Sequence, residues 1–165
     1  TSRHATEIAF AGGRLAPMTR IRTQIEIARD PRDVYDYVTT PTHWIEWHPS
    51  TRKVTGAADH SLAVGEECVE DAVVAGRALQ AIWRVDERDE PRRWVISTRG
   101  GAVQGTITYT VSPSANGGTM FQREFVYPTN SLRFVVANLL VVRRTVQAES
   151  EEAMRRLKRR LESPT

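Results

Sequence analysis

The sequence predicts a single α+β domain made of one strand, two short helices, a run of antiparallel strands and a long C-terminal helix. At 165 residues the chain has the length of one domain with a substantial core. Two helix starts fall within residues 31–48, and alternating segments between residues 51 and 127 are separated by turns, not helices. From about residue 129 to 162, apolar residues recur at helical spacing. Elements in this order are typical of proteins that enclose a cavity between sheet and helix.

The first strand and the two short helices are the part of the chain around which we expect the rest to be arranged. Residues 20–28 alternate in polarity, and one face of the expected strand carries Ile21, Thr23, Ile25 and Ile27. Helices are expected at 31–38 and 41–48. Asp30 and Thr40 are good N-cap residues, and each is followed by a proline at the first helical position.

Six further strands are expected after the helices, at residues 51–56, 66–74, 77–87, 92–98, 103–112 and 119–127. Turn residues separate the last five of them: Ala75-Gly76, Asp89-Glu90-Pro91, Gly100-Gly101 and Asn116-Gly117-Gly118. Because no helical pattern lies between these strands, the spacing favours an antiparallel meander.

One long helix is expected from about residue 129 to Glu162. Thr129, Asn130 or Ser131 can cap it, and its apolar stripe would consist of Val135, Leu139, Val142, Val146, Ala153, Leu157 and Leu161. The first half is rich in valine, so a strand is the alternative there. Acids and arginines alternate on the polar side of the second half, where spaced ion pairs support a helix.

Composition and charge exclude several classes of protein. The net charge is +3 and the pI near 9.4, yet acids and arginines are interleaved and no basic stripe with aromatics appears, so we expect no nucleic-acid partner. The longest apolar stretch, residues 132–142, is shorter than the roughly 20 residues of a membrane-spanning helix, so no stable membrane insertion is expected. Cys68 is the single cysteine, which fits a reducing, cytoplasmic location. Residues 1–17 are expected to be an extension of a domain at 18–165.

The order and spacing of several short motifs resemble a known family. They are the strand at 21–27, Val34, Tyr37-Val38, Pro41, Trp44, Trp47 and Pro49, then Val64-Gly65, Trp83-Arg84-Val85, Glu90-Pro91-Arg92, Tyr109-Thr110-Val111 and Gly118-Thr119. Residues 20–162 resemble the polyketide cyclase/dehydrase-like members of the START and birch-pollen-allergen superfamily. The resemblance implies the helix-grip fold, a strongly curved seven-stranded antiparallel sheet around a long C-terminal helix, with two short helices closing one end. It also implies a largely apolar pocket for lipids, polyketides or similar molecules.

The alternation of apolar residues indicates which side chains would face such a pocket. They are Cys68, Trp83, Val85, Trp94, Ile96, Ile107, Tyr109, Phe121, Phe125, Val135, Leu139 and Val142. The alternative is that each of them only fills a core, although one helix cannot fill a curved sheet completely. Trp44 and Trp47 lie one helical turn apart, and at least one is expected to plug the end of the pocket. Trp47 is also a candidate ligand contact, because in the family this helix edge lines the entrance.

Arg123 is the exception in the apolar pattern. It lies between Phe121 and Phe125 at a spacing of two, so it shares their face, where a charge must be paired or bound. Glu70, on the same face as Cys68, is the expected partner across the cavity. Our hypothesis is that Arg123 and Glu70 form the polar end of the pocket and orient an oxygen of the ligand. The alternative is that Arg123 points into water.

Other catalytic chemistry receives little support from the sequence. Tyr109 could donate a hydrogen bond to a ligand carbonyl or act as a weak acid, with a satisfied core tyrosine as the alternative. The four histidines lack zinc-site spacing, so we expect no metal, and no motif indicates a cofactor.

Two functions from different classes remain. The favoured one is a binding protein that holds a hydrophobic small molecule, such as a lipid, polyketide or other aromatic or isoprenoid compound, without altering it. The alternative is a polyketide cyclase, aromatase or dehydratase in which Tyr109, Arg123 or Glu70 moves a proton. Lipid exchange at a membrane surface is a third hypothesis, and a homodimer is left open.

Overall fold

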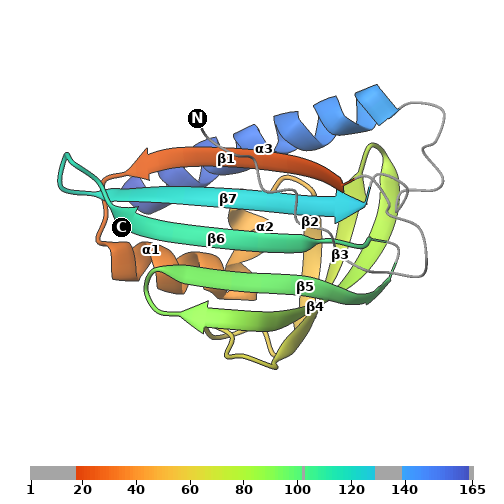
Figure 1. Ribbon diagram of the computed structural model, residues 1–165, viewed down its shortest axis with the longest axis horizontal. Helices are drawn as coiled ribbons and strands as arrows, with labels where there is room; N and C mark the ends of the chain where they lie inside the picture. The colour runs from red at the N-terminus through yellow and green to blue at the C-terminus, as the bar shows by residue number, and fades with distance from the viewer. Residues whose placement is uncertain (1–17, 102, 129–138, 164–165) are drawn as a thin grey trace, which may run out of the picture.

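The computed structural model describes residues 18–101, 103–128 and 139–163, and the side chains of 139–142 are not described. Seven strands form one antiparallel sheet in the order β1-β7-β6-β5-β4-β3-β2 (Figure 1). The strands are β1 (Met18–Ile27), β2 (Thr51–Gly56), β3 (Glu67–Val74), β4 (Arg77–Asp89), β5 (Arg93–Gly101), β6 (Thr106–Pro113) and β7 (Thr119–Pro128). The predicted seven-stranded antiparallel sheet is therefore confirmed.

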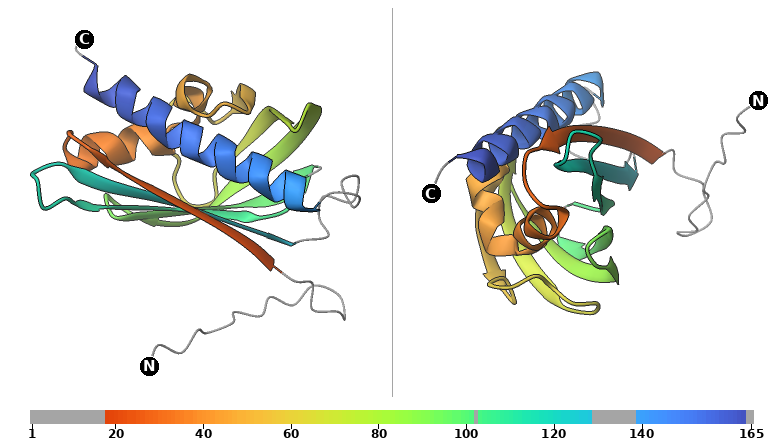
Figure 2. Two further views of the ribbon diagram at one scale, coloured as in Figure 1. Left: turned by 90° about the horizontal axis from the view of Figure 1, so that it is seen from above. Right: turned by 90° about the vertical axis from the view of Figure 1, so that its left-hand side faces the viewer.

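The described strands form an open sheet with β1 and β2 at its edges, and irregular pairing in β4 curves it. Strands β2 to β7 each pair with their neighbours in sequence. Strand β1 pairs with β7, so the first and last strands of the chain lie side by side. The register shifts between Ile82 and Trp83 and again between Val85 and Glu87 in β4, and irregularities of this kind bend a strand. Figure 2 shows the resulting curvature, with the helices on the concave side.

The two short helices follow β1 as expected, with a difference in the second. Helix α1 (Pro31–Thr39) is capped by Asp30, whose carboxylate accepts a 2.8 Å hydrogen bond from the Arg32 amide. The second helix is shorter and tighter than predicted, because it consists of a 3₁₀ turn, η1 (Pro41–His43), and one α turn, α2 (Trp44–Trp47). Thr40 occupies the N-cap position of η1 as predicted, but its side chain makes no capping hydrogen bond, because its hydroxyl donates to the Asp36 carbonyl of α1.

Helix α3 (Leu139–Glu162) ends where the spacing predicted. The predicted start near residue 129 lies outside the described residues. The strand alternative for the valine-rich half is wrong from residue 139 onward, because that part is helical. No helix within the described ranges is long and apolar enough to cross a membrane.

The core lies between the concave face of the sheet and the three α-helices. Alternating residues of β1 confirm the predicted face, because Ile21 and Ile27 are buried and Arg22 and Gln24 are exposed. The second half of α3 contributes Ala153, Met154 and Leu157 to the same core. This packed part occupies one end of the space under α3, and the first half of the helix covers the other end.

Candidate functional site

A cavity lies beneath the first half of α3, on the concave face of the sheet. Its volume is about 90 Å³. Its walls come from α2 and the stretch after it, from strands β3, β4, β6 and β7, from the connection before β6 and from α3. The cavity is smaller than the about 150 Å³ that hold benzene in an engineered protein cavity. A larger occupant must therefore extend past its mouth or move side chains.

Most of the cavity wall is apolar. The apolar lining residues are Trp44, Ala72, Val74, Leu79, Ala81, Trp83, Val103, Ile107, Phe125, Tyr127 and Val146. Val74 and Leu79, which flank the β3–β4 turn, are only partly buried, as is Val103 before β6. The wall is therefore most accessible at this end of the sheet, near the start of α3 (Figure 1).

Arg123 supplies a positive charge to this apolar wall. Only 4% of the residue is exposed, and the register places it opposite Thr23 of β1 on one side and Tyr109 of β6 on the other. Its Nη1 donates a 3.3 Å hydrogen bond to the Ser150 hydroxyl, and its guanidinium carbon lies 5.6 Å from the Phe125 ring centroid. Its Nε has no hydrogen-bond partner, and no described carboxylate forms an ion pair with it. A buried guanidinium without a carboxylate partner carries a positive charge that no nearby negative charge compensates.

Glu70 faces the same cavity but is bound to other groups. Its Oε1 lies 2.5 Å from the Thr51 hydroxyl oxygen, and its Oε2 accepts a 2.8 Å hydrogen bond from the Trp83 indole. Burial raises the pKa of Glu70, while these two hydrogen bonds and the Arg123 charge act in the opposite direction. The expected direct pair with Arg123 is absent from the described contacts, so Glu70 influences Arg123 across the cavity without touching it.

Tyr109 completes the polar end together with these two residues. Only 2% of it is exposed, and burial raises the pKa of its hydroxyl to about 12. The charge of the cross-strand neighbour Arg123 and a side-chain hydrogen bond with it oppose that increase in the pKa. At neutral pH Tyr109 is therefore a hydrogen-bond donor and not a base.

His48 also lines the cavity, and the sequence reasoning missed it. Its Nδ1 lies 2.9 Å from the Ser50 hydroxyl oxygen. Burial and the Arg123 charge hold the pKa of His48 well below its ordinary value, so the imidazole is neutral. The sequence contains one signal that could have indicated His48. It directly precedes Pro49, and the proline ends α2 and turns the chain toward β2.

The sequence analysis also did not predict two cavity-lining residues of α3. Ser150 and Glu149 line the cavity, although their stretch of sequence has the pattern of a solvated helix face. Burial raises the pKa of Glu149, against the opposing effect of the charges on Arg52 and Arg123. Helical spacing alone could not place this turn, because which side of α3 faces the sheet depends on how the helix crosses it.

The predicted ligand contacts fall into three groups. Glu70, Trp83, Ile107, Tyr109, Arg123 and Phe125 lie together on the cavity wall. Trp47, Cys68, Trp94 and Phe121 are instead buried in the adjacent core. Val135 lies outside the described residues, and the side chain of Leu139 is not described. The role of all of these residues as ligand contacts stays a prediction.

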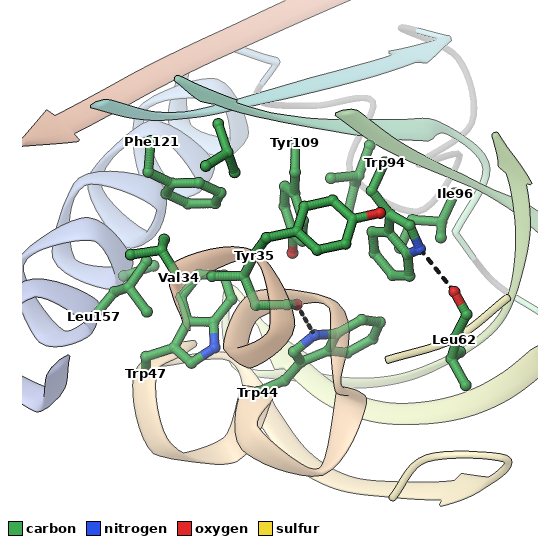
Figure 3. Close-up of a cluster of buried hydrophobic side chains, with 14 of the residues drawn as sticks. Val34, Tyr35, Trp44, Trp47, Leu62, Trp94, Ile96, Tyr109, Phe121 and Leu157 are labelled. Atoms are coloured by element: carbon green, nitrogen blue, oxygen red, sulfur yellow. Dashed lines mark hydrogen bonds between the residues drawn. The ribbon is translucent and has the colours of Figure 1, made fainter. Parts of the chain in front are cut away.

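Figure 3 shows the three aromatic members of the second group, Trp47, Trp94 and Phe121, within a cluster of buried side chains. The Trp47 ring makes edge contacts with Phe121, at 6.4 Å between centroids, and lies 6.2 Å from Tyr109. The Trp94 ring stacks on Tyr109 at 5.4 Å, and its indole donates to the Leu62 carbonyl. Tyr109 therefore belongs to both regions, with aromatic neighbours on one side and the cavity on the other.

The described residues contain no group of three or more His, Cys, Asp or Glu side chains arranged to hold a metal ion. The polar groups of the lining side chains are instead one guanidinium, two carboxyl groups, one carboxamide, one imidazole, two phenols and two hydroxyls. This set can bind oxygen atoms of an organic molecule and can exchange protons with it.

A curved antiparallel sheet gripping a long C-terminal helix, with a mainly apolar cavity between them, defines the helix-grip class of proteins. Residues 18–162 match the family described as polyketide cyclase / dehydrase and lipid transport, and the chain belongs to that family. The match covers all seven strands and α3, so the resemblance noted in the sequence is confirmed.

Three individual proteins are similar to this chain. The chain is 28% identical over 123 residues to penitrem biosynthesis cluster 1 protein I of Penicillium ochrochloron, covering 69% of this chain and 80% of that protein. TTHA0849 from Thermus thermophilus has a similar structure, with a TM-score of 0.73 at 17% identity over 87% of this chain and 97% of that one. The polyketide-cyclase-like protein Cgl2372 from Corynebacterium glutamicum gives a TM-score of 0.61 at 20% identity, over 87% and 91%. At these identities the two structures support the fold alone.

Proposed function

We propose that this protein binds a hydrophobic small molecule in the cavity beneath α3, with the polar part of the molecule at Arg123, Tyr109 and Glu70. The observation that carries the proposal is a buried arginine without a carboxylate partner among the described residues, on an otherwise apolar wall. Apolar pockets with a few converging polar groups are the usual form of small-molecule sites. The family's description, which includes lipid transport, agrees with such an occupant.

A second candidate, catalysis on a polyketide-like substrate, is favoured by one observation. His48 is neutral and lines the same cavity as Arg123 and Tyr109. In the tautomer whose Nδ1–H donates to the Ser50 hydroxyl, Nε2 has the free lone pair and would take a proton from a carbon beside a ketone, while Arg123 and Tyr109 would bind the resulting enolate oxygen. The relative from a penitrem biosynthesis cluster fits a biosynthetic role of this kind.

Native mass spectrometry of protein purified from its own host tests the binding function. We expect a defined mass adduct, which a cavity-filling substitution should remove. Ala81 lies on the cavity wall and is 4% exposed, so Ala81→Phe places a ring in the space. Ala78→Phe is the matched control, because Ala78 lies on the same strand and is exposed. An adduct of equal amount in both variants would place the ligand elsewhere and refute the proposal.

Incubation of the extracted ligand with the protein distinguishes binding from catalysis. If the ligand is recovered unchanged from wild-type protein, the binding function stands alone. A product formed by wild type and not by His48→Gln would establish the enzyme instead. His48→Gln keeps a polar side chain at the site but cannot transfer a proton at neutral pH.

A further inference from the structure

Arg123 has no charge partner among the described residues, and the surrounding groups show what kind of molecule would supply one. Its hydrogen-bonding neighbours are the neutral Ser150 and Tyr109 hydroxyls, and its Nε is unpaired. Thr23, which lies opposite Arg123 on β1, is also buried and its hydroxyl has no hydrogen-bond partner. Two neighbouring buried donors without acceptors are rare in folded proteins. An additional acceptor therefore fits this position.

The nearby acidic residues do not provide that acceptor. Both oxygens of Glu70 are engaged by Thr51 and Trp83. Glu149 lines the cavity, but the ion pairs of the described residues include none between it and Arg123. The sequence of residues 129–142 contains neither Asp nor Glu, so that segment has no carboxylate to contribute.

The size and charge of the site limit the choice of anion. A single guanidinium matches one negative charge, and its planar fork matches a carboxylate with two parallel N–H···O bonds. A phosphate monoester carries about two charges at neutral pH and would face Glu70 and Glu149 with only one cation opposite. The walls beyond Arg123 are apolar, and the cavity of about 90 Å³ holds a small head group and the first carbons of a chain.

We propose that the occupant is an amphipathic carboxylic acid, whose carboxylate binds the Arg123 guanidinium and whose apolar part extends along the cavity toward Val74 and Leu79. This inference rests on the proposed binding function and adds the charge and chemical class of the ligand. It accounts for an otherwise unpaired buried cation, and it predicts selectivity among ligands that have the same apolar part.

Three probes with the same ten-carbon chain test the charge requirement: decanoate, 1-decanol and decylammonium. Titration calorimetry at pH 7 with the full chain should show decanoate bound at least about tenfold more tightly than 1-decanol, because hydrogen bonds to charged groups are the stronger ones. Decylammonium should bind most weakly. Equal affinity for decanoate and 1-decanol would overturn the carboxylate inference and leave the binding function intact. Failure of all three probes to bind would overturn both.

Substitutions at Arg123 test whether that residue makes the selection. In Arg123→Gln the affinity for decanoate should fall to that for 1-decanol, and Arg123→Lys should retain part of the preference, since it keeps the charge and loses the fork. Arg22→Gln is the control, because Arg22 is an exposed arginine on the neighbouring strand, bound to Glu124. Decyl phosphate is the final probe. If it binds more tightly than decanoate, the carboxylate class is wrong.

Discussion

Replacing Arg123 with methionine should make the ligand-free protein more stable while weakening ligand binding. The favourable contacts of the buried guanidinium are a 3.3 Å hydrogen bond to Ser150, a side-chain hydrogen bond with Tyr109 and a ring contact at 5.6 Å with Phe125, and no described carboxylate offsets its desolvation. The penalty for burying an ion is several kcal/mol, and replacing buried charged groups with apolar ones of similar volume often stabilises a protein by about 1 to 4 kcal/mol. Methionine has a similar length and fills irregular space well.

The expected gain corresponds to a rise in Tm of at least about 2 °C, because a domain of this size gains about 2 to 4 °C per kcal/mol. Ligand-free wild type, prepared by unfolding and refolding, and the variant are compared by calorimetry and urea unfolding at pH 7. The same substitution is repeated in the Glu70→Gln background, so that Glu70 cannot be left as an unpaired charge. Arg22→Met is the surface control and should change stability by less than about 0.5 kcal/mol. A lower Tm for Arg123→Met in both backgrounds would show that Arg123 is already compensated, and would refute the reasoning.

Three further predictions follow from single interactions. Burial raises the pKa of Glu70 in the folded protein, so the free energy of unfolding of wild type should fall as the pH rises above 4.5 toward the folded pKa. Glu70→Gln should remove this pH dependence. Urea unfolding from pH 4 to 8 should therefore give a flatter profile for the variant. Asp30→Ala should destabilise by about 1 kcal/mol through loss of the α1 cap, with Asp33→Ala, one turn later and exposed, as the control in thermal unfolding. Leu157→Ala should lower the free energy of unfolding by about 2 to 5 kcal/mol, because this side chain of α3 is fully buried. A decrease below about 1 kcal/mol would mean that the second half of α3 is not packed on the sheet.

The sequence predicted most of the fold because the relevant signals are local. The alternation in β1, the Asp30-Pro31 helix start, and the turns at Ala75-Gly76 and Asn116-Gly117-Gly118 each act over a few residues. Ala75 and Gly76 have positive φ angles of 50° and 76°, as a tight hairpin requires. The second short helix was predicted less well, because Thr40 uses its hydroxyl to close α1 and leaves the next turn to continue as 3₁₀.

The candidate site was predictable in part, for the same reason. The spacing of Phe121, Arg123 and Phe125 placed the arginine on the inner face, and its burial agrees with that expectation. The partner of Glu70 was not predictable. Trp83 lies opposite Cys68 in the β3–β4 register, and its indole reaches diagonally to the Glu70 carboxylate. Pairwise geometry across strands depends on register, which alternation does not specify.

The sequence by itself determined the order of the elements, the inward faces of β1 and of β3 to β7, and the presence of a charged residue among apolar ones, since these depend on spacing along the chain. The tertiary structure decided which inward residues meet a cavity and which are packed. Trp47 and Phe121 pack against the second half of α3 and the neighbouring aromatics, whereas His48, Glu70 and Arg123 lie around the space under its first half. The physical reason is that the crossing of α3 over a bent sheet sets the distance between the two layers, and no local pattern encodes that distance.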